Sequence, residues 1–468
     1  MGKPEITDII VIGGGFAGLA AAIEARSAGA SVIVLEKMRA PGGNSIISDG
    51  GIAAAGTALQ HKLGIVDSPE IMAADMLRAG LGLNHPELVR VLAEKSDETL
   101  RWSAEYLGVE YMDRLDRFGG HSVARCYTPV GKTGAAIIRR QVLKAQELGI
   151  TIHTQACFQS FIRDESGRVA GVTVREGYDH RQPQAGSVKS VHARRGVILA
   201  SGGFGADIAF RAAQDPRLGD AIDTTNKPFA TAEALTRALL LGANPVQLSH
   251  IQLGPWASPD EQGYGEVPGF ADYIVFQYGL IVHPKTGKRL VNELGDRKTV
   301  ADAILAAGEP CLGLANAAAV EKSGWSIQHG LEKGVIKSFD QLEALGAYYG
   351  ITRQELETEV GRFNRFVEGG VDEDFGKPIL PDAVPLSHPP YYAVRLWPKV
   401  HYTMGGVQID TDARVIDLNQ QPIAGLYAAG EVTGGIHGAC RLGSCAITDC
   451  LVFGRIAGRN AATEERSA

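Results

Sequence analysis

The sequence predicts an α/β fold in which a parallel β-sheet ends in a row of glycine turns. Three observations lead to this prediction. A strand, a glycine turn, a helix and a second strand follow one another at the start of the chain, and two later apolar runs also end in glycines. The 468 residues include 58 glycines without a fibrous repeat, so the glycines are expected to serve tight turns and close backbone contacts.

The first of these units is the most specific. Its parts are an apolar strand at 9–12, Gly13, Gly15 and Gly18 in the pattern GxGxxG, a helix at 17–28 and a strand at 31–35. Such glycines let the backbone approach a pyrophosphate, and the positive end of the following helix favours its charge. Glu36, at the end of the second strand, is placed to accept hydrogen bonds from a ribose. The unit predicts a Rossmann-like dinucleotide site; a plain βαβ turn is the alternative.

Later glycine stretches indicate FAD rather than NAD. Residues 41–56 form a second glycine-rich stretch, expected where a longer cofactor extends past the first turn. Residues 196–207 and 422–435 each contain a strand and a glycine turn, and the second turn carries Glu431. The carboxyl ends of parallel strands meet at one sheet edge, where cofactors bind. A second strand–GxGxxG–helix unit is missing, which disfavours an NAD-binding dehydrogenase.

Composition argues against several other classes of protein. The formal net charge is −7 and the pI is about 6.0, unlike a general nucleic-acid binder. We expect no membrane span, because no run of about 18 uncharged apolar residues occurs. The first residues lead directly into a strand and lack a secretory pattern, so a cytoplasmic location is expected. Six cysteines without a CxxC pair indicate neither a disulfide framework nor a metal site.

Half of the cysteines lie in the stretch GACRLGSCAITDC. Positions five apart on a helix differ in direction by about 140°, so these side chains cannot share one face. They are expected to be small buried residues, namely Cys440, Cys445 and Cys450. A helix is expected at 445–462, with Ser444 as its N-cap. The chemistry of this stretch is therefore assigned to Arg441.

Three motifs resemble the flavoprotein family of soluble fumarate reductases and succinate dehydrogenase flavoprotein subunits, which includes urocanate reductase and 3-ketosteroid dehydrogenases. They are HYTMGG (401–406), GEVTGGIHGACRLGSCAITD (430–449) and GKRLVNELGDR (287–297). The resemblance covers essentially the whole chain. It implies a Rossmann-like, GR2-type FAD-binding domain made of 1–225 and 386–468, with an α+β substrate-capping domain at 226–385 inserted between them.

The resemblance also implies how FAD is bound. Asn44 stands where some members attach FAD through a histidine, so non-covalent FAD is expected. The helix that follows Arg441 points its N-terminus at the flavin, where its dipole stabilises negative charge. His437 is expected to support the flavin and Glu431 to bind the ribityl chain or ribose. The expected cofactor residues are Gly13, Gly15, Phe16, Ala17, Gly18, Glu36, Lys37, Gly43, Asn44, Ser45, Gly50, Gly51, Gly202, Gly203, Gly430, Glu431, His437, Ser444, Ala446 and Ile447.

For the reaction, the family pattern makes Arg297 the general acid and pairs His401 with Arg441 as a clamp for one substrate carboxylate. A planar guanidinium suits a carboxylate, and histidine adds a donor. The alternatives are an anion anchor for Arg297 and a plain buried histidine for His401. Metal ligands are not expected.

Other positions depart from the family pattern. The second carboxylate clamp and the proton relay are replaced by Gly254, Asp272, Tyr273 and Phe276. This makes fumarate or succinate an unexpected substrate and favours a molecule with one carboxylate. An aromatic pocket is expected from Trp256, Tyr273, Phe276 and Tyr278, although such residues are also common in cores. Candidate acids, bases or donors are Tyr273, Tyr402 and His250.

The resemblance, together with these departures, implies a flavin-dependent oxidoreductase acting on a CH–CH bond. The first expectation is α,β-desaturation of a cyclic keto acid or monocarboxylate, such as 4-oxocyclohexanecarboxylate. One alternative is reduction of an unsaturated carboxylate by a separate electron donor, and another is a non-catalytic electron-transfer flavoprotein. In either enzymatic direction an external electron acceptor or donor is needed, because the chain has no haem-attachment or iron–sulfur spacing.

Overall fold

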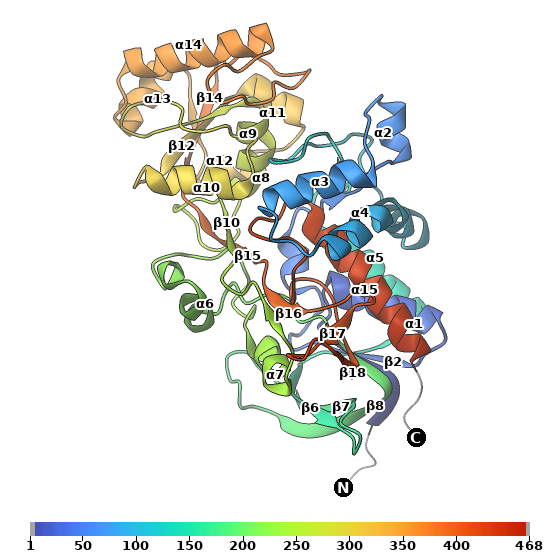
Figure 1. Ribbon diagram of the computed structural model, residues 1–468. Coiled ribbons are helices and arrows are strands. Elements are labelled where there is room, and N and C mark those ends of the chain that lie inside the picture. The colour runs from blue at the N-terminus through green and yellow to red at the C-terminus, as the bar shows by residue number, and fades with distance from the viewer. Residues whose placement is uncertain (1–4, 465–468) are drawn as a thin grey trace.

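The computed structural model describes residues 5–464, and an eight-stranded sheet forms the base of the molecule (Figure 1). Its main path is β17-β18-β8-β1-β2-β5, and β7 connects β8 to β6. The strands are β1 (Glu5–Ile12), β2 (Val32–Leu35), β5 (Thr151–His153), β6 (Ala156–Arg163), β7 (Val169–Glu176), β8 (Ser187–Leu199), β17 (Arg414–Ile416) and β18 (Pro422–Ala428). Strands β5, β2, β1, β8 and β18 run parallel, whereas β6, β7 and β17 pair antiparallel.

The register of the parallel strands brings their carboxyl ends to one level. Ile12 pairs with both Leu35 and Leu199, and Leu199 pairs with Ala428. The glycine turns that follow these strands therefore lie side by side, as the sequence predicts. Strands β6 and β7 form an antiparallel hairpin at the far edge of β8.

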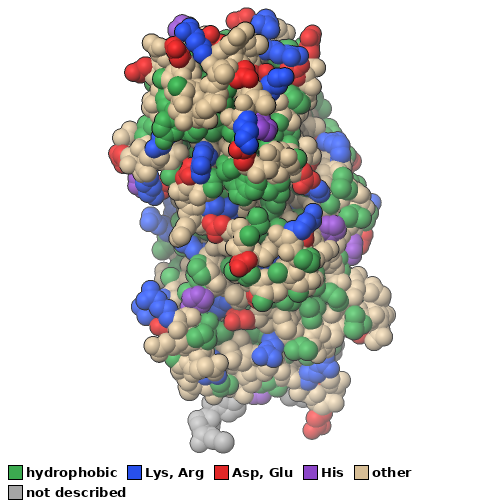
Figure 2. Space-filling view, turned by 90° about the vertical axis from the view of Figure 1, so that its left-hand side faces the viewer, with side chains coloured by type: hydrophobic (Ala, Val, Ile, Leu, Met, Phe, Trp, Pro, Cys, Tyr) green, Lys and Arg blue, Asp and Glu red, His purple; other side chains and the backbone are tan. Residues whose placement is uncertain are grey.

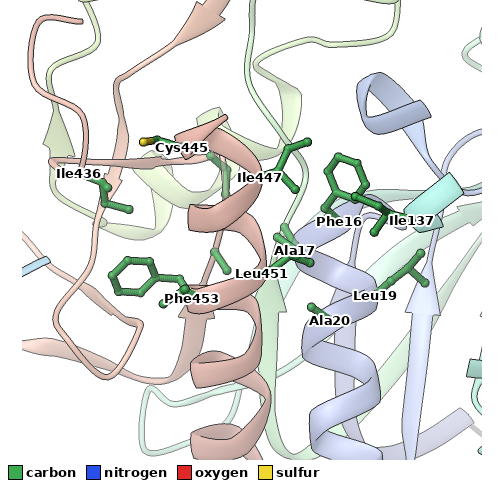
Figure 3. Close-up of a cluster of buried hydrophobic side chains, with 14 of the residues drawn as sticks. Phe16, Ala17, Leu19, Ala20, Ile137, Ile436, Cys445, Ile447, Leu451 and Phe453 are labelled. Atoms are coloured by element: carbon green, nitrogen blue, oxygen red, sulfur yellow. The ribbon is translucent and has the colours of Figure 1, made fainter. Parts of the chain in front are cut away.

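The two ends of the chain meet in a pair of packed helices, α1 (Phe16–Ser27) and α15 (Cys445–Thr463) (Figures 1 and 3). Close approach depends on two glycines of α15. A Cβ at Gly454 would lie 2.5 Å from the carbonyl oxygen of Ala17, and one at Gly458 would lie 2.2 Å from that of Ala21. Phe16, Ile447 and Leu451 belong to the buried apolar cluster between and around these helices (Figure 3).

A smaller sheet with its own core forms the top of the molecule in Figure 1. Its antiparallel order is β11-β12-β14-β13, made of β11 (Leu280–Val282), β12 (Cys311–Asn316), β14 (Tyr391–Leu396) and β13 (Lys337–Phe339). Helices α13 (Leu342–Tyr349) and α14 (Arg353–Gly369) pack on it. The expected cap bounds, 226–385, stay a prediction; β14 pairs within this sheet, which favours a later end.

The remaining elements connect and cover these two sheets. The short strands are β3 (Ile52–Ala53), β4 (Cys126–Tyr127), β9 (Pro245–Val246), β10 (Ile251–Gly254), β15 (Lys399–Thr403), β16 (Gly406–Gln408) and β19 (Thr433–Gly434). The other α-helices are α2 (Ala58–Lys62), α3 (Pro69–Ala79), α4 (Pro86–Arg101), α5 (Gly134–Glu147), α6 (Ile208–Gln214), α7 (Glu233–Leu241), α8 (Val267–Phe270), α9 (Phe276–Tyr278), α10 (Arg297–Ala306), α11 (Ala317–Ser323) and α12 (Gln328–Glu332). Antiparallel β10 and β15 lie between the larger and the smaller part (Figure 1).

On the face in Figure 2, basic and acidic side chains are interspersed rather than gathered by sign. Among residues 5–464, no helix is both long and apolar enough to cross a bilayer. All six cysteines are free, and Cys450 is half-buried while the other five are buried.

Candidate active site

A groove of 140 Å³ runs along the glycine turns at the carboxyl ends of the parallel strands. Its walls include most of the expected cofactor residues, among them Gly13, Gly15, Phe16, Ala17, Glu36, Lys37, Gly43, Asn44, Ser45, Gly202, Gly203, Gly430 and Glu431. Glycine is required at Gly13, where φ is +103° and a Cβ would lie 2.3 Å from the carbonyl oxygen of Ala200. A Cβ at Gly203 would lie 2.3 Å from the carboxylate of Glu431. These positions leave backbone exposed to a ligand, as FAD requires.

The groove also has the polar groups that a dinucleotide needs. Gly15, the N-cap of α1, supplies no side-chain cap, so this helix end can receive a phosphate. Glu36 accepts hydrogen bonds from the backbone N–H groups of Gly14 (3.0 Å) and Met38 (2.8 Å). Burial raises the pKa of Glu36. Its expected hydrogen bond to ribose stays a prediction.

Asn44 lies where the groove meets a second cavity. Its amide donates to Asn226 Oδ1 (2.6 Å) and accepts from the N–H of Lys227 (2.8 Å). Both interactions fix the amide, which has no nucleophilic nitrogen. Non-covalent FAD therefore stays the prediction.

The second cavity has a volume of 130 Å³ and adjoins the groove through shared walls. It collects charged, polar and aromatic side chains from distant parts of the chain. They include Asp272, Arg297, His401, Tyr402, Arg441, Trp256 and Tyr264, with Gly51, Ser444, Ala446 and Ile447 beside them. The expected catalytic and clamp residues Arg297, His401, Arg441 and Tyr402 are thus brought together.

Arg441 is held in the loop before α15 as a buried cation. Its Nη1 donates to the carbonyl oxygen of Leu442 (2.9 Å), and its guanidinium lies 4.7 Å from the ring centre of Tyr402. Its Nε is buried without a hydrogen-bond partner, and it forms no ion pair with any residue from 5 to 464. Burial and the nearby Arg297 lower the pKa of Arg441 to about 10. Such a guanidinium is suited to an anionic ligand.

His401 lies on β15 beside the two arginines. Its Nδ1 is 2.8 Å from Thr225 Oγ1, and its ring meets Trp256 edge to face at 4.6 Å between centres. Burial, followed by the charges of Arg441 and Arg297, lowers its pKa well below the usual value. The histidine is therefore neutral at pH 7, and a neutral imidazole can donate one hydrogen bond to a carboxylate.

Arg297 begins α10 because Asp296 caps that helix by accepting from the N–H of Thr299 (3.1 Å). Its Nη2 donates to Asp272 Oδ2 at 3.3 Å, and its guanidinium lies 5.6 Å from the ring of Trp256. Asp272 lies in the π-helical turn Ala271–Val275, and burial raises its pKa to about 6 although Arg297 opposes that shift. The pair presents a guanidinium whose orientation is fixed by a carboxylate.

Several expected substrate residues lie outside this cavity. Tyr273 faces a larger cleft of 1210 Å³ that adjoins the cavity, and its hydroxyl donates to Asp49 Oδ2 (2.9 Å). Phe276 and Gly254 line neither space, and a Cβ at Gly254 would lie 3.0 Å from the Trp256 ring. Phe276 is a buried core residue. Tyr278 donates instead to Asp382 (3.2 Å), so Trp256 alone of the expected aromatic set lines the cavity.

His250 lines a different space, together with Lys298, Asp302 and Leu305 of α10. Positions 298, 302 and 305 share one face of that helix, and Arg297 is turned about 100° from Lys298. This rotation separates His250 from the cavity.

The start of α15 corrects one detail of the prediction. The helix begins after Ser444, but this residue has a φ of +65° and its side chain makes no capping bond. Its Oγ is buried without a partner in the described chain. The N-terminus of α15 is thus left uncapped beside Ala446 and Ile447, which line the cavity. His437 lines neither cavity nor groove; its Nε2 lies 3.2 Å from Asp449 Oδ2, and its ring meets that of Tyr402.

Sequence reasoning missed Thr225, Asp49 and Tyr264. All three line the cavity, and Thr225 orients His401. They carry no motif, because loops far apart in the sequence bring them here. The role of Asp272 was missed as well, although its position was noticed as a departure.

The fold, the groove and the adjoining cavity define a flavoprotein oxidoreductase. Residues 8–447 match the family described as FAD binding domain, and the chain belongs to this family. FAD is its cofactor.

Similar proteins narrow the class further. The chain is 44% identical over 463 residues to the acrylate reductase flavoprotein subunit of Shewanella woodyi, with 97% of this chain and 90% of the relative covered. It is 38% identical to a fumarate reductase (cytochrome) of Shewanella frigidimarina, covering 98% of this chain and 77% of the relative. The open conformation of a flavocytochrome c3 fumarate reductase matches with a TM-score of 0.75, at 34% identity and with 98% and 79% of the two chains covered. The resemblance to this family is confirmed, and the chain is a flavin-dependent CH–CH oxidoreductase.

Proposed function

We propose that this flavoprotein reduces the carbon–carbon double bond of a short α,β-unsaturated monocarboxylate, of which acrylate is the simplest. The observation that carries the proposal is the state of the two arginines. Arg297 is already paired with Asp272, whereas Arg441 has no ion-pair partner in the described chain. The cavity therefore offers one open anion site. A relative named for acrylate, at 44% identity, supports the same substrate class.

The arginines and the histidine of the cavity each have one role in this reaction. Arg441 binds the substrate carboxylate and His401 adds a hydrogen bond to it. Arg297, oriented by Asp272, donates a proton to the carbon next to the carboxylate. FAD, when bound in the groove and reduced, would supply a hydride to the other carbon of the double bond. One hydride and one proton together convert acrylate into propionate.

The electrons come from a separate donor, as the sequence predicts. The relative from Shewanella woodyi is named as one subunit, which supports a second protein in this role. A cytoplasmic location stays a prediction.

Desaturation of a cyclic keto acid, the first expectation, has less support. Tyr273, a candidate base for it, donates a hydrogen bond to Asp49 and faces the outer cleft. Tyr402, the other candidate, lies beneath the guanidinium of Arg441, and burial raises its pKa well above the usual value. Neither hydroxyl is poised to accept a proton from a substrate carbon.

Anaerobic mixing tests both directions. Dithionite-reduced holoenzyme, freed of excess reductant, is mixed with acrylate or fumarate while flavin absorbance is followed. Acrylate should restore the oxidised spectrum and yield one propionate per flavin, and fumarate should restore it much more slowly.

The oxidised enzyme is mixed in parallel with 4-oxocyclohexanecarboxylate, and bleaching of the flavin in that experiment would favour desaturation. A reduced flavin that no unsaturated monocarboxylate reoxidises would refute the proposal. If small electron carriers alone then reoxidise it, the protein is an electron-transfer flavoprotein.

A further inference from the structure

Asp272 is an unusual residue to find in a cavity that binds an anion. The carboxylate is buried, with 8% of the residue exposed, and its Oδ2 lies 3.3 Å from Arg297 Nη2. It lines the same 130 Å³ cavity as Arg441 and His401. A buried negative charge at this point weakens the binding of any further anion nearby.

Three carboxylates line the cavity in the described chain, and they differ in the groups that they contact. Asp49 accepts from Tyr273 and faces the outer cleft as well, while Glu431 accepts from the N–H of Thr403 (3.0 Å) and faces the groove. Among the described carboxylates that line the cavity, only Asp272 contacts one of its guanidinium groups. The charge of Arg297 is therefore balanced by Asp272, whereas Arg441 has no carboxylate partner in the described chain.

A ligand with one carboxylate uses the open arginine. Within the cavity, the guanidinium left for a second carboxylate is that of Arg297, where Asp272 already lies. No cationic side chain lining the cavity is left for it in the part of the chain that the structure describes. We propose that Asp272 selects ligands by charge, because it takes the position of a second ligand carboxylate against Arg297 and so excludes dicarboxylates.

This inference rests on the proposed function only in using Arg441 as the anchor of the ligand carboxylate. Propionate and malonate test it, because both have three carbons and they differ by one carboxylate. Their dissociation constants are measured at pH 8 on oxidised holoenzyme from the perturbation of the flavin spectrum. The variants are Asp272→Asn and Asp272→Thr. The control is Asp260→Asn, which breaks an Asp–Arg pair with Arg395 away from the cavity.

The wild type should bind propionate at least about tenfold more tightly than malonate, since like charges at close range cost this much or more. Both Asp272 variants should reduce that ratio by about tenfold or more, and Asp260→Asn should leave it unchanged. Equal binding of the two acids by the wild type, or an unchanged ratio in an Asp272 variant that retains FAD, overturns the proposal. If neither variant retains FAD, the ratio of the malonate and propionate dissociation constants of the wild type alone tests the proposal. A wild type that discriminates as expected but does not reduce acrylate refutes the proposed reaction and leaves the charge selection standing.

Discussion

Replacement of Arg441 by alanine should separate ligand binding from folding. The guanidinium loses hydration on burial, and its pKa near 10 corresponds to about 3 kcal/mol of unfavourable burial. The contact with the Tyr402 ring at 4.7 Å returns about 2 kcal/mol in a desolvated setting. These contributions nearly cancel, so Arg441→Ala should change the free energy of unfolding by about 1 kcal/mol or less.

Binding should respond far more strongly. The substrate carboxylate loses a buried charge-assisted pair, which costs about 3 kcal/mol or about 150-fold in affinity. The assay is the dissociation constant of propionate from flavin difference spectra, with kcat/KM for acrylate measured on the same preparations. Arg441→Lys should recover part of the affinity, because a lysine keeps the charge and loses the bidentate geometry.

Arg455, on the helix α15 that follows Arg441, provides a matched control. It is buried, pairs with Glu24 (3.0 Å) and Glu98 (2.7 Å), and lies 5.1 Å from the Trp102 ring. Arg455→Ala should lower the free energy of unfolding by about 2 kcal/mol, because the buried carboxylate of Glu24 loses one of its two arginine partners and keeps only Arg459 among the described residues. It should leave the propionate dissociation constant unchanged. If Arg441→Ala binds propionate within about threefold of the wild type, the assignment of Arg441 as the carboxylate anchor is wrong.

Three further predictions concern the cofactor and the buried acid. Gly13→Ala should abolish FAD retention after gel filtration, because its Cβ would lie 2.3 Å from the Ala200 carbonyl at a φ of +103°; a yellow, stoichiometric variant would contradict this. Acid precipitation of the wild type should release all flavin into the supernatant, since Asn44 offers no covalent attachment, whereas a yellow pellet would disprove it. The pKa of Asp272, raised to about 6 by burial, should affect stability between about pH 4 and pH 6. In that window the folded state holds a proton that the unfolded state has lost, so this contribution is complete below pH 4 and is lost as the pH rises through 6. In urea titrations the free energy of unfolding of Asp272→Asn, relative to that of the wild type, should therefore rise by about 3 kcal/mol between pH 4 and pH 7. Parallel plots of unfolding free energy against pH for the two proteins would contradict the shift.

The sequence by itself determined the cofactor half of the site. Glycine turns after buried strands are local patterns, because a positive φ or a close backbone approach excludes other residues at each position. That is why Gly13 and Glu36 could be assigned from spacing. The clamp residues His401 and Arg441 came from motifs of the family, and the structure places both in one cavity.

The tertiary structure alone decided which neighbours complete the cavity. Thr225 meets His401 across 176 residues of chain, and Asp272 meets Arg297 across 25, and no local pattern encodes either pair. It also placed Tyr273 in the outer cleft and turned His250 away, because the packing of whole helices and strands sets the direction of each side chain. Charge selection at Asp272 belongs to this second kind of information, since the effect of a carboxylate depends on its burial and on the guanidinium beside it.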